Sequence, residues 1–294
     1  MTIKSVAFIG AGLIGAPMAS RVQQAGFELT VCDRNQAVLD AFAADGATVT
    51  MSVSDCASSD AVIILLANDA QIKETMLGEN GLVQAIPTGQ KPIVCMMSTT
   101  LPDTLKLLKQ ALDAVGVRLV DAPISGGIVG AEQGTLTVMM GGDDADIETV
   151  MPLMQSMGQR IFHCGSLGAG EVTKVINNML CVANMYLTAE AVELAQLHGV
   201  SFEKLSPILA VSTGTNFLTV DAELGREQYH AWGGADQDYT AIHNIVAKDL
   251  HLALKLAEQA NTDLGLLKST SQYVDSAMED PSVAERWKRI GNDK

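Results

Sequence analysis

Basic residues are scarce in this sequence: it has 19 lysines and arginines against 34 acidic residues, and its formal net charge is −15. Such a chain has no broad basic surface that could neutralise phosphates, which excludes nucleic acid as a partner. It also has no basic amphipathic run for an anionic membrane surface. Because no segment reaches the roughly 18 uninterrupted apolar residues of a membrane helix, we expect no membrane partner.

Cysteine pairs, a signal peptide and metal-binding motifs are missing as well. The five cysteines are scattered, without a CxxC pair, and stand mostly in apolar runs, which is typical of core residues in a reducing compartment. The N-terminus lacks the features of a signal peptide, so we expect a cytoplasmic protein. The five histidines show no metal-ligand spacing such as HExxH, and no Ser/His/Asp set stands out. We therefore expect neither a metal site nor hydrolytic chemistry.

Hydrophobic residues, by contrast, make up 48% of the 294 residues, enough for two domains of ordinary size. In residues 1–165, apolar runs such as VAFIG and AVIILLA alternate with segments of helical spacing at Ala16–Ala25 and Leu101–Val115. This alternation predicts a Rossmann-type α/β domain with a parallel sheet covered by helices on both faces. The expected strands are Ser5–Gly10, Glu28–Asp33, Ala61–Ala67, Pro92–Ser98 and Arg118–Pro123, with two edge strands at Thr135–Gly141 and Arg160–Gly165.

Residues 166–294 have a different texture and predict an all-α domain for substrate binding and oligomerisation. The segment Glu171–His198 contains neither glycine nor proline, and Gly199 supplies a stop signal. A helix of this length would span about 42 Å. Because it is apolar on more than one face, we expect it to be buried between the domains. Helices should continue to the end, with loops around Ser212–Asn216 and His230–Asp238.

A glycine loop follows the first expected strand. The segment Gly10-Ala-Gly12-Leu13-Ile14-Gly15 fits the pattern G-x-G-x-x-G, which is weak alone but here lies between a strand and a helix. Gly10 would permit the tight turn, Gly12 the approach of backbone to a pyrophosphate, and Gly15 close helix–strand packing. The helix N-terminus would supply N–H groups and partial positive charge. The loop therefore predicts a bound dinucleotide.

An acidic residue ends the second expected strand. The carboxylate of Asp33 can accept hydrogen bonds from the adenine ribose and repel a 2′-phosphate, which favours NAD. The adjacent Arg34 could accommodate that phosphate, so NADP stays open as the alternative. The pair could also be a turn that merely ends the strand.

Two further segments carry candidate substrate groups. Ser125, Gly126 and Gly127 follow the fifth strand, where a hydroxyl and backbone N–H groups could hold a carboxylate, although a capped turn explains them equally. The hydroxyls of Ser98 and Thr99 could contact nicotinamide or substrate, or cap the next helix.

The long helix carries Lys174 and Asn178 four residues apart, so both point to one side. Burial would lower the pKa of the lysine and suit it to proton transfer. The alternatives are a lysine that reaches the surface or pairs with Glu171.

Five segments, FIGAGLIGAPMA, MMSTT, DAPISGGIVGAEQGTLTVMMGG, GAGEVTKVINN and AKDLHLAL, together resemble the β-hydroxyacid dehydrogenase family, in order along nearly the whole chain. The resemblance implies that Lys174 is the general acid/base and that Asn178 hydrogen-bonds the substrate. It implies that Ser125 and the two glycines after it hold the substrate carboxylate. It also implies that Lys248 closes over cofactor and substrate, with Asp249 as support.

The resemblance implies an NAD(P)-dependent oxidoreductase that acts reversibly on a small 3-hydroxy acid similar to 3-hydroxyisobutyrate. Tartronate semialdehyde, threonate and succinic semialdehyde/4-hydroxybutyrate stay open as substrates, as does a noncatalytic dinucleotide-binding sensor. The loop ending at Asn216 and Phe217, and the stretch before Lys248, depart from the family pattern, which leaves the substrate undecided. We interpret His243 in that stretch as a surface or core residue. The helical second domain favours a homodimer or homotetramer.

Overall fold

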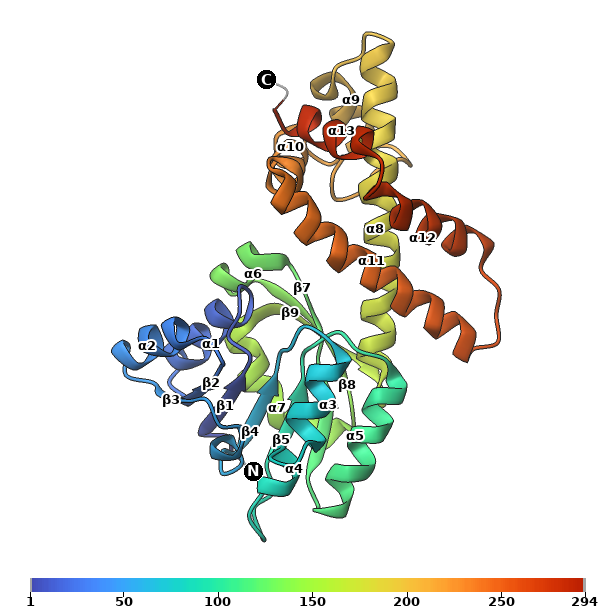
Figure 1. The fold of residues 1–294 in the computed structure, drawn as a ribbon. Helices are drawn as coiled ribbons and strands as arrows, with labels where there is room; N and C mark the ends of the chain where they lie inside the picture. The colour runs from blue at the N-terminus through green and yellow to red at the C-terminus, as the bar shows by residue number, and fades with distance from the viewer. Residues whose placement is uncertain (1, 293–294) are drawn as a thin grey trace. The chain divides into compact units, whose positions relative to one another are not determined.

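The computed structural model describes residues 2–292, and the chain forms two compact units that divide after Lys174 (Figure 1). The first unit is α/β, and in the second every regular element of the described residues is a helix. Among residues 2–292, none of the helices combines the length and apolarity needed to span a bilayer.

The first unit is built on a nine-stranded sheet in which β1 to β6 run parallel, in the order β3-β2-β1-β4-β5-β6-β8-β7, with β9 paired to β8. The strand β8 runs antiparallel to β6 and β7 and parallel to β9. The strand order reverses between β1 and β4, which is where open α/β sheets bind ligands at their carboxyl edge. The strands are β1 (Ser5–Ile9), β2 (Glu28–Cys32), β3 (Thr48–Thr50), β4 (Ala61–Ile64), β5 (Ile93–Met96), β6 (Arg118–Asp121), β7 (Ile124–Ser125), β8 (Leu136–Gly141) and β9 (Gly158–Gly165). The helices are α1 (Gly15–Gln24), α2 (Gln36–Ala44), η1 (Val53–Cys56), α3 (Asp69–Leu77), α4 (Leu82–Ala85), α5 (Pro102–Ala114), α6 (Gly127–Gln133) and α7 (Asp144–Met157).

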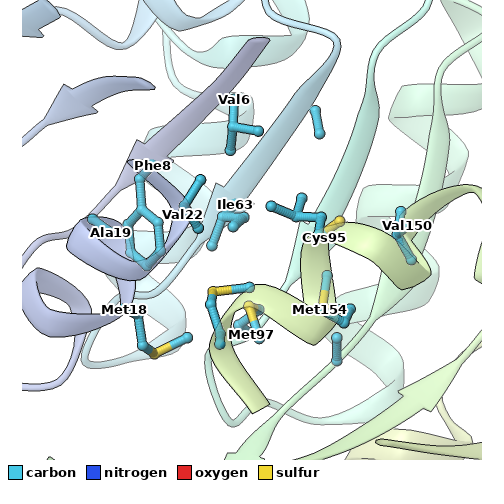
Figure 2. Close-up of a cluster of buried hydrophobic side chains, with 14 of the residues drawn as sticks. Val6, Phe8, Met18, Ala19, Val22, Ile63, Cys95, Met97, Val150 and Met154 are labelled. Atoms are coloured by element: carbon cyan, nitrogen blue, oxygen red, sulfur yellow. The ribbon is translucent and has the colours of Figure 1, made fainter. Parts of the chain in front are cut away.

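Alternate residues of the central strands feed two separate cores. Phe8 and Ile63 point to one face of the sheet, where they meet side chains of α1 and α7 such as Met18 and Met154 (Figure 2). Their neighbours in sequence belong to the opposite core, together with apolar residues of α3 and α5. Burial of both faces is why these strands are continuous apolar runs in the sequence.

The second unit packs its helices around aromatic side chains. All four tyrosines and both tryptophans of the chain lie in it, and the fully buried Trp287 stands with its ring centroid 5.0 Å from Tyr186 and 5.6 Å from Tyr229. The helices are α8 (Ala169–Leu197), which begins in the first unit, and then α9 (Phe202–Ala210), α10 (Ala222–Gly233), α11 (Asp236–Gln259), α12 (Gly265–Ala277) and α13 (Pro281–Asn292).

The fold class predicted from the sequence is confirmed, and two details are wrong. The loop expected at His230–Asp238 is shorter, because α10 continues to Gly233 and α11 begins at Asp236. Gly233 is required by packing, since a Cβ there would lie 2.9 Å from the Cβ of Trp287. Asp236 and Asp238 stabilise the first turn of α11, because acidic side chains are favourable at a helix N-terminus. The helix α8 is not buried on all faces, because side chains such as Leu187 are 65% exposed.

Candidate active site

The three glycines of the loop between β1 and α1 occupy three different environments. Gly10 has φ +98°, and a Cβ there would lie 2.1 Å from the carbonyl oxygen of Leu65. A Cβ on Gly15 would lie 2.1 Å from the carbonyl oxygen of Gly10, whereas one on Gly12 would meet no heavy atom within 4 Å. Gly10 and Gly15 are therefore needed for the fold, and Gly12 borders open space of the kind a pyrophosphate would occupy.

The carboxylate of Asp33 is tied to this loop. One oxygen accepts a hydrogen bond from Ala11 N at 2.8 Å, and the other from Asn35 N at 2.8 Å. The side chain is partly buried, while Arg34 and Leu13 are exposed and Ile14 is partly buried. The loop and the acidic residue predicted from sequence are thus brought together at the carboxyl ends of β1 and β2.

Three residues with hydroxyl groups, Ser98, Thr99 and Thr100, follow β5 and differ in their surroundings. Ser98 is 1% exposed, and its Oγ accepts a hydrogen bond from Leu66 N at 2.6 Å. Its expected contact with nicotinamide or substrate is therefore wrong, because the hydroxyl ties two loops together. Thr99 is partly buried and stays a candidate. The next hydroxyl, that of Thr100, donates to Asp69 Oδ1 at 2.6 Å.

The Ser-Gly-Gly turn leaves the sheet at β7. Ser125 pairs with Thr137 of β8 and is partly buried, and the two glycines after it are exposed. Gly126 has φ +134° and Gly127 has φ +62°, both in the region that favours glycine. A Cβ on Gly127 would meet no heavy atom within 4 Å, so the turn is open to a ligand.

Asp121, at the end of β6, has a structural role near the candidate site that the sequence did not predict. It is fully buried, and its carboxylate accepts hydrogen bonds from Gly168 N at 2.7 Å and Glu171 N at 2.8 Å. Burial raises its pKa, although these N–H bonds act in the opposite direction. By satisfying backbone N–H groups of the first turn, Asp121 fixes the start of α8 at the carboxyl edge of the sheet.

Lys174 lies in that same part of α8. Its side chain is buried, with 9% exposed. One turn earlier, Glu171 is fully buried, and its Oε2 accepts a hydrogen bond from Thr100 N at 3.0 Å. Burial is the main cause that raises the pKa of Glu171 well above its usual range, and the charge of Lys174 opposes that rise.

In the second unit, Asp249 holds two predicted site residues. Asn178 Nδ2 donates to Asp249 Oδ2 at 2.6 Å, and Lys248 Nζ lies 2.7 Å from Asp249 Oδ1. The carboxylate is buried, as expected of a supporting residue. His243 is a core residue, 4% exposed, whose Nδ1 lies 3.2 Å from the hydroxyl of Tyr186.

The loop that ends at Asn216 and Phe217 is held by hydrogen bonds of Asn216. The Asn216 side chain donates to Thr188 Oγ1 of α8 at 3.0 Å and accepts from Leu218 N at 2.9 Å, so it ties its loop to that helix. No group of three or more His, Cys, Asp or Glu side chains within residues 2–292 is placed to bind a metal ion.

Known proteins resemble this chain over both halves. Residues 5–165 match a family model described as the NAD binding domain of 6-phosphogluconate dehydrogenase. Residues 168–284 match one described as NAD-binding of NADP-dependent 3-hydroxyisobutyrate dehydrogenase. The NAD-dependent L-serine dehydrogenase of Pseudomonas aeruginosa is 37% identical over 276 residues, covering 90% of each chain. The mitochondrial 3-hydroxyisobutyrate dehydrogenase of Drosophila melanogaster is 36% identical, covering 90% of this chain and 81% of its own.

The fold is shared with solved structures of the same group. A 3-hydroxyisobutyrate dehydrogenase from Salmonella typhimurium superposes with a TM-score of 0.79 at 26% identity, covering 96% of this chain and 99% of its own. The Mycobacterium tuberculosis 3-hydroxyisobutyrate dehydrogenase, described together with L-serine, has a TM-score of 0.82 at 24% identity and covers 99% of both chains.

Proposed function

Because the chain belongs to the β-hydroxyacid dehydrogenase family, we propose that it reversibly oxidises a small 3-hydroxy acid, 3-hydroxyisobutyrate or a close analogue, with NAD. L-serine, named for one relative and one neighbour, is also a 3-hydroxy acid. The observation that carries the proposal is the hydrogen bonding of Asp121 to the first turn of α8. It brings Lys174 to the same sheet edge as the glycine loop and the Ser-Gly-Gly turn.

Residues of the first unit have different proposed roles in binding and in proton transfer. The Ser125 hydroxyl and the N–H groups of Gly126 and Gly127 hold the substrate carboxylate. Lys174, as the neutral amine, takes the proton from the substrate hydroxyl during oxidation and returns it during reduction. A cofactor held by the glycine loop would supply nicotinamide as the acceptor of the hydride from the hydroxyl-bearing carbon. Asp33 accepts hydrogen bonds from the adenine ribose hydroxyls, which favours NAD over NADP.

Two residues of the second unit are proposed as further substrate contacts. Asn178 projects from the same face of α8 as Lys174, one turn later, and would hydrogen-bond the substrate. Lys248 would contact substrate and cofactor, with Asp249 holding both side chains in place.

The test is Lys174→Ala with Lys106→Ala as control, since Lys106 is an exposed lysine on α5. We expect the first variant to bind NADH normally and to lose about 10²- to 10⁴-fold in kcat, the usual contribution of general acid–base catalysis. The control should be unchanged. Near-normal turnover of Lys174→Ala would contradict the assignment. If the wild type binds NADH but turns over none of a panel of hydroxy acids with either cofactor, the noncatalytic sensor becomes the better interpretation.

We also propose that two copies of the chain associate through α8. Leu180, Leu187 and Leu194 recur every seven residues on one face of this helix and are 56%, 65% and 59% exposed. A seven-residue apolar spacing is the pattern by which two helices pack along their length. A homodimer, or a tetramer built from it, would cover this stripe. All five cysteines are free thiols, which supports a cytoplasmic location.

A further inference from the structure

One oxygen of a buried carboxyl is left without a hydrogen bond in the first unit. Glu171 is fully buried, its Oε2 accepts from Thr100 N at 3.0 Å, and its Oε1 has no hydrogen-bond partner within the described residues. An unpaired buried carboxylate oxygen is costly, because the protein does not replace the water that it loses. The hydrogen bond to Thr100 therefore accounts for Oε2 of Glu171 and leaves the burial of Oε1 unexplained.

The groups that face Glu171 come from three elements. Asp121 of β6 accepts the backbone N–H of Glu171, and Asp69 of α3 accepts the hydroxyl of Thr100. Both negative charges, together with burial, raise the pKa of Glu171. Lys174, one turn later on α8, is the cation whose charge favours the ionised carboxyl.

We propose that Glu171 is a positioning residue for Lys174: its buried carboxylate favours the ammonium form of the lysine over the neutral amine and so sets how readily the lysine takes up and gives up its proton. The inference rests on the proposed role of Lys174 as the general acid/base. Opposite charges one turn apart each favour the charged form of the other, so the Lys174 ammonium favours the Glu171 carboxylate, against the burial that raises the pKa of that carboxyl. Lys174 loses its proton next to a negative charge, which makes it a stronger base than burial alone would allow.

The consequence is a lysine that keeps its proton for delivery to a carbonyl oxygen. Burial disfavours the ammonium and lowers the pKa of a lysine, whereas an adjacent carboxylate raises it. Glu171 would thus counteract the effect of the apolar surroundings on Lys174. A merely structural Glu171 would support Thr100 and leave the titration of the lysine untouched.

The substitution Glu171→Gln separates the two roles, because glutamine keeps an acceptor for Thr100 N and removes the charge. We expect the midpoint of the pH profile of kcat/KM for hydroxy-acid oxidation to move to lower pH by about one unit, the lower end of what a close opposite charge contributes. Glu171→Asp, which retains the charge, should have a midpoint between those of Glu171→Gln and the wild type. Glu148→Gln makes the same change at an exposed position of α7 and should leave the profile unchanged.

A second measurement does not depend on turnover. In protein carrying ¹³C-labelled lysine, the Lys174 side-chain resonance, assigned with Lys174→Arg, should titrate at lower pH in Glu171→Gln than in wild type. Coincident titrations in the two proteins would overturn the inference. If the wild type oxidises no hydroxy acid, the proposed function fails, but this titration still decides the role of Glu171.

Discussion

The glycine loop offers a substitution that should separate folding from cofactor binding. Replacing Gly12 by alanine adds a methyl group that meets no protein atom within 4 Å, at a φ outside the left-handed region. Where alanine fits the native backbone, replacing glycine stabilises a protein by about 0.4–1 kcal/mol, because the unfolded chain loses freedom. We therefore expect Gly12→Ala to fold normally and to melt up to a few degrees higher, at roughly 2–4 °C per kcal/mol.

Cofactor binding should respond in the opposite direction. The new methyl group stands where the pyrophosphate must approach the backbone, so at least one hydrogen bond from a loop N–H to a phosphate is lost. A hydrogen bond to a charged group contributes about 1.5–3 kcal/mol, which corresponds to a dissociation constant roughly 10- to 150-fold weaker.

Gly15→Ala is the matched comparison within the same loop. Its Cβ would lie 2.1 Å from the carbonyl oxygen of Gly10, well inside contact distance, so the loop must shift. Such overpacking costs about 1–3 kcal/mol, and this variant should melt below the wild type. Thermal unfolding without ligand and fluorescence titration with NADH measure the two effects. Wild-type NADH affinity in Gly12→Ala, or a destabilisation of Gly12→Ala as large as that of Gly15→Ala, would refute the reasoning.

Two further predictions concern cofactor choice and assembly. Asp33→Ser should weaken NAD binding roughly 10- to 150-fold and weaken NADP binding less, because the lost carboxylate also repelled the 2′-phosphate. Calorimetric titration with both cofactors checks this, with Asp40→Ser as the control. An unchanged ratio of the NAD and NADP dissociation constants would contradict it. Leu187→Glu should reduce the mass measured by sedimentation to that of the 31.0 kDa chain. The control is Leu266→Glu, at a side chain of α12 that is 84% exposed, and it should leave the mass unchanged. A monomeric wild type would contradict the proposed association.

The features that the sequence predicts well are those that neighbouring residues determine. The run from Ala61 to Ile64 is buried on both faces of the sheet, so its apolar character alone identifies a central strand. The glycine loop is likewise recognisable because strand, loop and helix are contiguous. The short strands β3 and β7 were not expected, since segments of three and two residues carry too little periodicity to be distinguished from loops.

Features that depend on distant residues were not accessible in this way. The carboxylate of Asp121 accepts a hydrogen bond from the backbone N–H of Gly168, 47 residues later. The neighbouring sequence does not distinguish it from any other acidic residue at the end of a strand. The sequence around Ser98 allows either a ligand contact or a helix cap, because it does not reveal that the hydroxyl accepts a hydrogen bond from Leu66 N, 32 residues away. Likewise, Gly233 resembles a loop glycine until Trp287 is known to pack against it.

The hydrogen bonding of Asp121 also explains glycines that have no chemistry of their own. A Cβ on Gly141 would lie 2.4 Å from Asp121 Oδ1, and one on Gly170 would lie 2.3 Å from the carbonyl oxygen of Met139 and 2.8 Å from Asp121 Oδ2. Any side chain at either position would push the first turn of α8 away from β6 and β8. Because Lys174 follows on the same helix, such a shift would displace the proposed general acid/base, and misplacement by about 1 Å can cost 10²-fold in rate. Gly141 and Gly170 therefore support the proposed site through the backbone approach that they permit.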